Sequence, residues 1–145
     1  MNPGEKLVLL VEDDPNDVAL VQRVFDRFAV ANRLEVVRDG AAALQRLGCD
    51  RPETGPLDVS LVLLDLKLPK VHGLEVLRRI REDPRTHRLR VVILTSSFAD
   101  EERLASYDYG ANSFVRKPIE FAKFAEAIKE VGLYWLIFDA GPPPG

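Results

Sequence analysis

The stretch Leu61-Val62-Leu63-Leu64-Asp65 decides the fold of this chain. Four consecutive branched aliphatic residues, followed beyond Asp65 by Pro69 and Gly73, are typical of a buried strand that ends at a turn. Open α/β sheets bind their ligands at the carboxyl ends of the strands. A carboxylate in this position is therefore a candidate functional group.

Three other strand-like segments also end in reactive polar groups. They are followed by Glu12-Asp13-Asp14, by Thr95-Ser96-Ser97 and by Lys117-Pro118. With Asp65, these segments supply an acidic cluster, a hydroxyl group and an amine, each from its own strand end. Together they predict a site that handles a phosphoryl group, with Asp65 as its principal residue.

Strand-like and helix-like segments alternate along the whole chain. Strands are predicted at residues 7–11, 34–37, 59–64, 91–94 and 113–116, and helices after Asp14, around residues 41–47, after Gly73, after Asp100 and from Phe121 toward Trp135. Strands separated by helices of this length imply a parallel sheet with right-handed crossovers. The chain is therefore predicted to be one α/β domain.

The composition limits the classes of function. The chain has 145 residues, of which 46% are hydrophobic and 30% charged, with a net charge of -3 and a single cysteine. Mixed charges argue against a nucleic-acid partner, which requires a concentrated basic face. No apolar run approaches the length of a membrane span. One cysteine allows no intrachain disulfide, so we expect a cytoplasmic protein; Cys49 itself receives no role.

The chemistry of phosphoryl transfer assigns a task to each polar group. Asp65 can supply the nucleophilic oxygen, and Asp13 a hard oxygen ligand for Mg²⁺, with Glu12 orienting the bound waters. Lys117 can offer a positive charge to the phosphoryl group, and Thr95 a hydroxyl hydrogen bond.

With these residues in this order, the chain resembles the receiver domain of bacterial two-component response regulators. The matching positions are Glu12-Asp13, Asp65 with Pro69 and Gly73, Thr95, and Lys117-Pro118, and the resemblance covers residues 6–135. It implies a flavodoxin-like, doubly wound (βα)5 fold whose five-stranded parallel sheet has the order 2-1-3-4-5. It further implies a receiver domain over residues 6–138 and a flexible Pro/Gly tail over residues 139–145.

The resemblance also assigns roles by position. Asp65 matches the phosphoacceptor, and Mg²⁺, with Mn²⁺ as the alternative ion, is expected on Asp13, Asp65, the backbone carbonyl of Lys67 and, through water, Glu12. The remaining roles are phosphoryl stabilisation and switching by Thr95, Lys117 and Phe114, tuning of phosphoryl lifetime by Lys67 and Ser97, and a cis bond at Lys117-Pro118. His72 stands where the family usually has Asp or Asn, and little consequence is expected.

The implied function is that of a single-domain response regulator, a signalling switch and not an enzyme that processes substrates. A sensor histidine kinase is its expected partner. Three segments resemble the corresponding parts of regulators paired with phytochrome-type kinases. They are the loop over residues 48–57, Ser106-Tyr107-Asp108 and the end of the chain around Trp135.

The run Leu133-Tyr134-Trp135-Leu136-Ile137-Phe138 has two interpretations. The chain end could fold over its own core. We favour a homodimer interface formed with the last helix and the strand at 113–116, because Trp and Tyr often anchor interfaces.

Other readings of the site remain open. A phosphatase of the haloacid-dehalogenase type would also use a strand-end Asp, but position 67 is Lys where that family has a second Asp. A degenerate receiver could act only as a binding module. Taken singly, several residues have ordinary interpretations: Asp14 as a helix cap, Glu12 as a solvated acid, Thr95 as a strand end, Lys117, His72 and His87 as surface residues, and Phe114 as a core aromatic.

Overall fold

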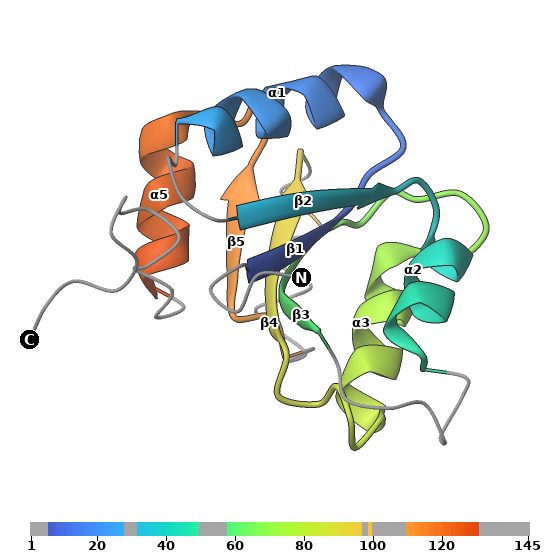
Figure 1. The fold of residues 1–145 in the computed structure, drawn as a ribbon. Coiled ribbons are helices and arrows are strands. Elements are labelled where there is room, and N and C mark those ends of the chain that lie inside the picture. Colours follow the sequence, from blue (N-terminus) through green and yellow to red (C-terminus); the bar gives the residue numbers. More distant parts are fainter. Residues whose placement is uncertain (1–5, 28–31, 50–57, 97–98, 100–109, 131–145) are drawn as a thin grey trace, which may run out of the picture.

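A five-stranded parallel sheet forms the centre of the described part of the chain. The computed structural model describes residues 6–27, 32–49, 58–96, 99 and 110–130. The strands are β1 (Lys6–Val11), β2 (Asn32–Val37), β3 (Val59–Asp65), β4 (Arg90–Thr95) and β5 (Ser113–Arg116), and the described helices are α1 (Pro15–Asp26), α2 (Gly40–Leu47), α3 (Gly73–Glu82) and α5 (Phe121–Glu130). The sheet order is β2-β1-β3-β4-β5 (Figure 1). The predicted fold class and strand order are confirmed.

Some predicted features lie outside the described residues. They are the helix after Asp100, Ser97, Ser106-Tyr107-Asp108, the apolar run at 133–138 and the tail at 139–145, together with most of the 48–57 loop. The division between domain and tail therefore stays a prediction. No helix in the described part of the chain has the length and apolar character needed to cross a membrane.

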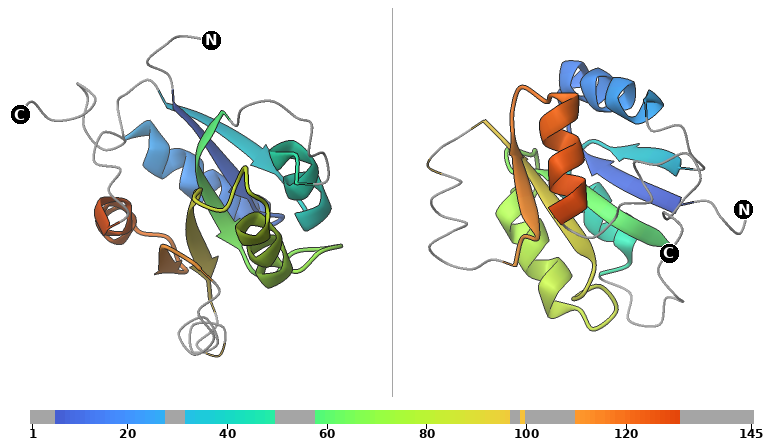
Figure 2. Two further views of the ribbon diagram at one scale, coloured as in Figure 1. Left: turned by 90° about the horizontal axis from the view of Figure 1, so that it is seen from below. Right: turned by 90° about the vertical axis from the view of Figure 1, so that its left-hand side faces the viewer.

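Strand side chains alternate between two cores, one on each face of the sheet. Val8, Leu10, Leu61 and Leu63 pack with apolar residues of α1 and α5. Their neighbours in sequence point to the opposite face and pack with α2 and α3. Figure 2 shows the two pairs of helices on either side of the sheet. Since both faces are covered, β3 is apolar at almost every position, and the run before Asp65 is buried as predicted.

The chain reverses its winding between β1 and β3. Helix α1 leads from β1 to β2 over one face, whereas α2 leads from β2 across to β3 over the other. The carboxyl ends of β1 and β3 are therefore neighbours with no helix crossing directly between them. Such a switch point is where open α/β sheets bind their ligands.

Helix α3 starts in close contact with the end of β3. A Cβ atom on Gly73 would lie 2.5 Å from the carbonyl oxygen of Asp65 and 2.5 Å from Cα of Leu66. Only glycine fits this approach. The preceding residue, His72, is exposed as predicted, but it also caps the helix, because its Nδ1 accepts a hydrogen bond from the backbone N–H of Leu74 at 3.2 Å.

The capping role of His72 yields a stability prediction. His72→Ala removes the acceptor and is expected to lower the free energy of unfolding by about 1 kcal/mol. His72→Asp retains an acceptor and places a negative charge at the helix amino terminus, so it is expected to raise stability by about 0.5 kcal/mol. Urea unfolding at pH 8 measures both. Equal midpoints for the two variants would contradict the capping role.

Candidate functional site

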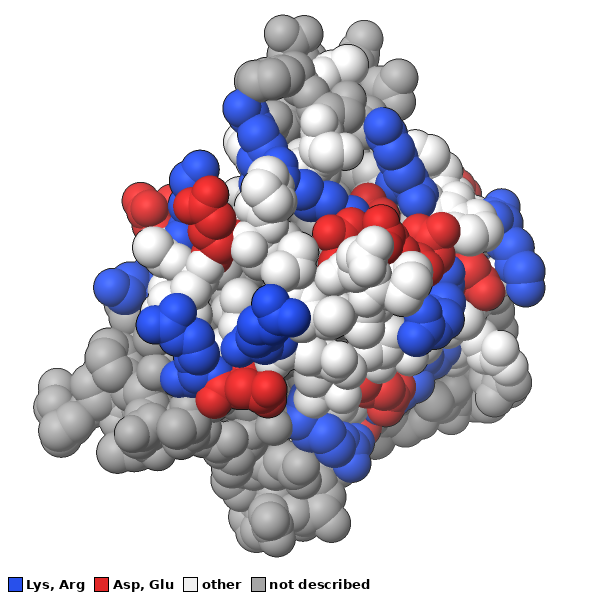
Figure 3. Space-filling model, turned by 90° about the horizontal axis from the view of Figure 1, so that it is seen from above, with Lys and Arg blue, Asp and Glu red and all other residues white. Residues whose placement is uncertain are grey.

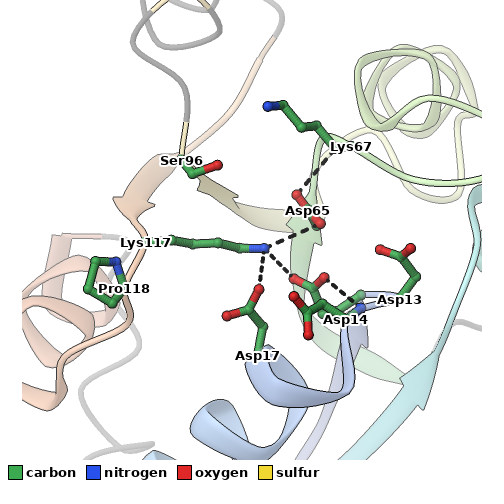
Figure 4. A pocket seen from close by; sticks show the side chains of 9 residues that line it. Asp13, Asp14, Asp17, Asp65, Lys67, Ser96, Lys117 and Pro118 are labelled. Carbon is green, nitrogen blue, oxygen red and sulfur yellow. Dashed lines mark hydrogen bonds and ion pairs between the residues drawn. The ribbon is translucent and has the colours of Figure 1, made fainter.

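The register of the sheet brings the predicted polar groups to one edge. Val11 pairs with Leu64, so Glu12 follows β1 beside Asp65, the last residue of β3. On the other side Thr95 pairs with Arg116, so Lys117 follows directly after β5. The backbone N–H of Lys117 donates to the carbonyl oxygen of Thr95 at 2.8 Å. Figure 4 shows the side chains converging on one cleft.

The ammonium group of Lys117 lies at the centre of this cleft. Its Nζ atom is 2.8 Å from Oε2 of Glu12, 2.8 Å from Oδ2 of Asp17 and 3.3 Å from Oδ2 of Asp65. These carboxylates come from the end of β1, the first turn of α1 and the end of β3. One cation therefore joins three separate segments of the chain.

Burial strengthens the coupling between these groups. Glu12 is fully buried, and its side chain also accepts a hydrogen bond at Oε1 from the backbone N–H of Asp14 at 3.1 Å. Burial raises the pKa of Glu12 to about 7, although the hydrogen bond from Lys117 opposes this. Burial lowers the pKa of Lys117, but hydrogen bonds to Asp17 and Glu12 outweigh it, so this pKa lies above its ordinary value. Lys117 is thus held in its charged form.

Asp65 lines the cleft, and both of its carboxylate oxygens contact other groups. Oδ1 accepts a hydrogen bond from the backbone N–H of Lys67 at 3.2 Å, while Oδ2 faces Lys117. The cleft has a volume of about 560 Å³, and its lining consists of Glu12, Asp13, Asp14, Asp17, Asp65, Lys67, Ser96, Lys117 and Pro118. It is large enough for a phosphoryl group next to the Asp65 carboxylate.

Three acidic residues form a candidate cation site. Glu12, Asp13 and Asp65 each offer a carboxylate oxygen, and these oxygens lie within 4.8 Å of one another. Glu12 and Asp65 are buried, whereas Asp13 is exposed. Lys117 alone offsets only part of this negative charge, and hard oxygen donors are the ligands that Mg²⁺ prefers. The residues present therefore fit a divalent cation.

The ordinary interpretations fail for three of the site residues. Glu12 is buried and so is not a solvated acid, and the Lys117 side chain is only 13% exposed and so is not a solvated surface lysine. Phe114 is 45% exposed on β5 and so is not a core aromatic. By contrast, Asp14 is the amino-terminal cap of α1, as its ordinary interpretation held, because it accepts from the N–H of Asn16 at 2.8 Å.

The other predicted positions are placed as follows. Thr95 is buried at the end of β4, and the Lys117-Pro118 bond is cis, as the resemblance implied. The Lys67 side chain is exposed at the cleft. The metal contact of the Lys67 carbonyl, the phosphoryl contact of Thr95 and the tuning roles stay predictions.

Two residues of the cleft received no role from the sequence. Ser96 lines it next to Thr95, and Asp17 contacts Lys117 directly. Asp17 could have been identified from its place in the first turn of a helix that starts directly after the acidic pair. The distant residue that it contacts is 100 positions away, and local patterns do not reveal such a contact.

Comparison with known families agrees with this geometry. The family model of the response regulator receiver domain matches residues 8–129. The chain belongs to this family.

Several relatives match nearly the whole receiver domain. The probable methanogenesis regulatory protein FilR2 of Methanothrix harundinacea is 38% identical over 138 residues, which cover 95% of this chain and 88% of that protein. Response regulator Rcp1 of Synechocystis sp. is 34% identical over 131 residues, covering 90% and 89%.

Solved structures also resemble the fold. The bacteriophytochrome response regulator RtBRR has a TM-score of 0.81 and 41% identity, covering 96% of this chain and 85% of that one. The Mn²⁺-bound form of response regulator Rcp1 has a TM-score of 0.70 and 34% identity, covering 95% and 99%.

The carboxylate cluster predicts that Mg²⁺ stabilises this receiver domain. At a Mg²⁺ concentration about ten times Kd, binding contributes about 1.4 kcal/mol to the free energy of unfolding, which corresponds to a rise in Tm of about 4 °C. Asp13→Asn should abolish most of this rise, and Asp26→Asn, an exposed acid at the far end of α1, should retain it. Thermal unfolding with and without Mg²⁺ checks this. An equal rise in both variants would exclude Asp13 as a ligand.

Proposed function

We propose that this receiver domain accepts a phosphoryl group on Asp65 from a sensor histidine kinase and thereby changes its interaction surface. The observation that supports this most strongly is the buried Asp65 carboxylate with the Lys117 ammonium 3.3 Å from its Oδ2, beside an acidic cluster that fits Mg²⁺. Membership of the receiver family supports the same conclusion.

The transfer is an in-line displacement at phosphorus. An oxygen of Asp65 forms the new P–O bond while the P–N bond to the kinase histidine breaks. The imidazole keeps the electron pair of that bond and takes a proton from solvent. Hydrolysis of the acyl phosphate by water then releases phosphate and restores the carboxylate.

The residues around Asp65 act by charge and position. Mg²⁺, held by Asp13 and Asp65 with Glu12 nearby, would offset charge on the phosphoryl oxygens. Lys117 supplies a second positive charge at the same place, and its raised pKa keeps it protonated. Thr95, one residue beyond the β4 residue that pairs with Asp65, would donate its hydroxyl to a phosphoryl oxygen.

Switching would follow from the new contacts of the phosphoryl group. We infer that Thr95 and Lys117 move toward it and that Phe114 changes orientation, which alters the surface of β5 and α5. Phe114 is exposed on β5, an edge strand of the described sheet, where a change of orientation would be visible to a partner. The protein is then a cytoplasmic signalling switch that catalyses only its own phosphorylation and dephosphorylation.

The kinase is proposed to be of the phytochrome type. Support comes from the likeness to RtBRR, whose name describes a bacteriophytochrome response regulator. Phosphotransfer profiling against a panel of histidine kinases tests this pairing, and faster transfer from an unrelated kinase would overturn it.

No nucleic-acid partner is proposed. On the face of the molecule where α1 lies, acidic side chains occur in several places and basic ones lie between them (Figure 3). That face therefore lacks the concentrated basic surface that binding to a phosphate backbone requires.

Phosphorylation of Asp65 can be measured directly. Incubation with Mg²⁺ and phosphoramidate is expected to add one phosphoryl group, detected by intact mass, and chelation of Mg²⁺ should prevent it. Asp65→Ala should show no adduct, whereas Asp26→Asn should behave like the wild type.

Other outcomes would favour the rival functions. Absence of an adduct with both phosphoramidate and a kinase would indicate a receiver that serves only as a binding module. Sustained hydrolysis of a small phosphomonoester, lost in Asp65→Ala, would indicate a phosphatase.

A homodimer through β5, the last helix and the apolar run at 133–138 is also proposed. Among the described residues, Phe114 on β5 is the one large hydrophobic side chain that is exposed, and it offers an anchor. Sedimentation at micromolar concentration should show a dimer that Phe114→Glu weakens. Gln45→Glu, the same gain of charge on an exposed position of α2, should leave it intact. A monomer with and without phosphorylation would contradict the proposal.

A further inference from the structure

Asp17 lies on the opposite side of the Lys117 ammonium from the end of β3 (Figure 4). Its Oδ2 is 2.8 Å from Nζ, as close as the oxygen of Glu12 and closer than that of Asp65, at 3.3 Å. The contact joins the first turn of α1 to the residue that follows β5. In this structure, the ammonium thus lies closer to Glu12 and Asp17 than to Asp65.

The positions of both partners are fixed by their backbone surroundings. Asp17 belongs to the first turn of a helix that starts at Pro15 and is capped by Asp14. Lys117 is anchored through its backbone N–H to the carbonyl oxygen of Thr95. Neither end of the pair depends on a long unsupported loop, so the contact is defined by the fold.

An ammonium group has three N–H donors, and in this structure three carboxylates surround it. A phosphoryl oxygen on Asp65 would need one of those donors more strongly than the bare carboxylate does, because the phosphoryl group carries more charge. The donor that faces Asp65 at 3.3 Å would pass to the phosphoryl oxygen, and the larger charge would draw the ammonium toward it. The contact to Glu12 or the contact to Asp17 would then lengthen.

Burial decides which contact gives way. Glu12 has no exposed surface, and a buried carboxylate left without its counter-ion is strongly destabilising. The Asp17 side chain is 18% exposed and lines the open cleft, so water can replace Lys117 at its oxygen. Loss of the Asp17 contact is therefore the less costly change.

We propose that Asp17 is a positioning residue that holds Lys117 on the α1 side of the cleft and competes with the phosphoryl group for its ammonium. This inference rests on the proposed function. It makes Asp17 a determinant of how strongly the site retains a phosphoryl group. The competition also makes the first turn of α1 sensitive to phosphorylation of Asp65, because water replaces Lys117 at the Asp17 carboxylate when Lys117 moves away.

Beryllofluoride with Mg²⁺, a non-covalent analogue of the phosphoryl group, is the probe for this competition. Asp17→Asn keeps the size of the side chain but removes the ion pair, and it is expected to tighten beryllofluoride binding about fivefold, the upper range for a partly exposed pair. Asp17→Ala, which removes the acceptor altogether, should act in the same direction. Titration followed by ¹⁹F NMR measures the affinity.

Asp14→Asn is the matched control. Asp14 lines the same cleft, and Asn caps a helix as well as Asp does, so this variant removes one negative charge without removing a recorded contact to Lys117. Its effect on affinity measures through-space repulsion of the anionic probe. The expected change is less than about twofold.

A second readout follows the ammonium group itself in protein free of metal and probe. The ¹H–¹⁵N signal of the Lys117 side chain, assigned by its loss in Lys117→Arg, should shift or exchange faster with water in Asp17→Asn and not in Asp14→Asn.

Each outcome decides between the possibilities. Tighter beryllofluoride binding together with a changed Lys117 signal, in Asp17→Asn and not in Asp14→Asn, supports the inference, and weaker binding in Asp17→Asn would overturn it. Equal effects of Asp14→Asn and Asp17→Asn on affinity, or an unchanged Lys117 signal, would mean that Asp17 acts only through its negative charge and not by holding Lys117. Either result would overturn the inference. If phosphoramidate modifies Asp65 but Asp17→Asn and Asp17→Ala bind beryllofluoride like the wild type, the inference alone fails. If wild-type Asp65 takes neither phosphoryl nor beryllofluoride, the proposed function fails and the inference with it.

Discussion

The ion pairs of the Lys117 ammonium are the interaction on which the site depends. Lys117 follows β5, Glu12 follows β1, and Asp65 ends β3. A buried carboxylate such as Glu12 is tolerated because a cation is within 2.8 Å of it. The same cation stands 3.3 Å from Asp65, where a phosphoryl group would attach. The positive charge of Lys117 therefore serves both the stability of the fold and the proposed function.

The sheet makes this arrangement rigid. Residues of β1, β3 and β4 are buried on both faces between α1 and α5 on one side and α2 and α3 on the other. Because a shift of one residue would exchange the two faces of a strand, the register is strongly fixed. That register places Glu12 beside Asp65, and it places Lys117 one residue beyond the partner of Thr95. Apolar packing at some distance from the site thus determines where the functional atoms lie.

Close backbone approaches complete the site. Gly73 brings the start of α3 against the carbonyl of Asp65, and Gly40 brings the start of α2 against Val71, where a Cβ would be 2.1 Å from its carbonyl oxygen. The connection after β3 is therefore confined between two helix starts. It carries Lys67, whose backbone N–H holds one oxygen of Asp65. This connection therefore has little room to move when a group is attached to Asp65.

The sequence by itself determined the described strands and helices and the candidate chemistry. Apolar runs of strand length predicted the strands, and the Asp14-Pro15 pair predicted the helix cap. The polar groups at strand ends predicted the order of the site residues. All three are local features of the sequence. Glu12, Asp65 and Lys117 were recognisable because their residue types and order match a known family.

Only the tertiary structure decided which of these groups touch. The 100-residue separation of Asp17 and Lys117 hides their contact from any local pattern, and the exposure of Phe114 depends on β5 lying at the edge of the described sheet. Distances between segments are set by packing of the whole chain, and so the partners of Lys117 emerge only from the fold.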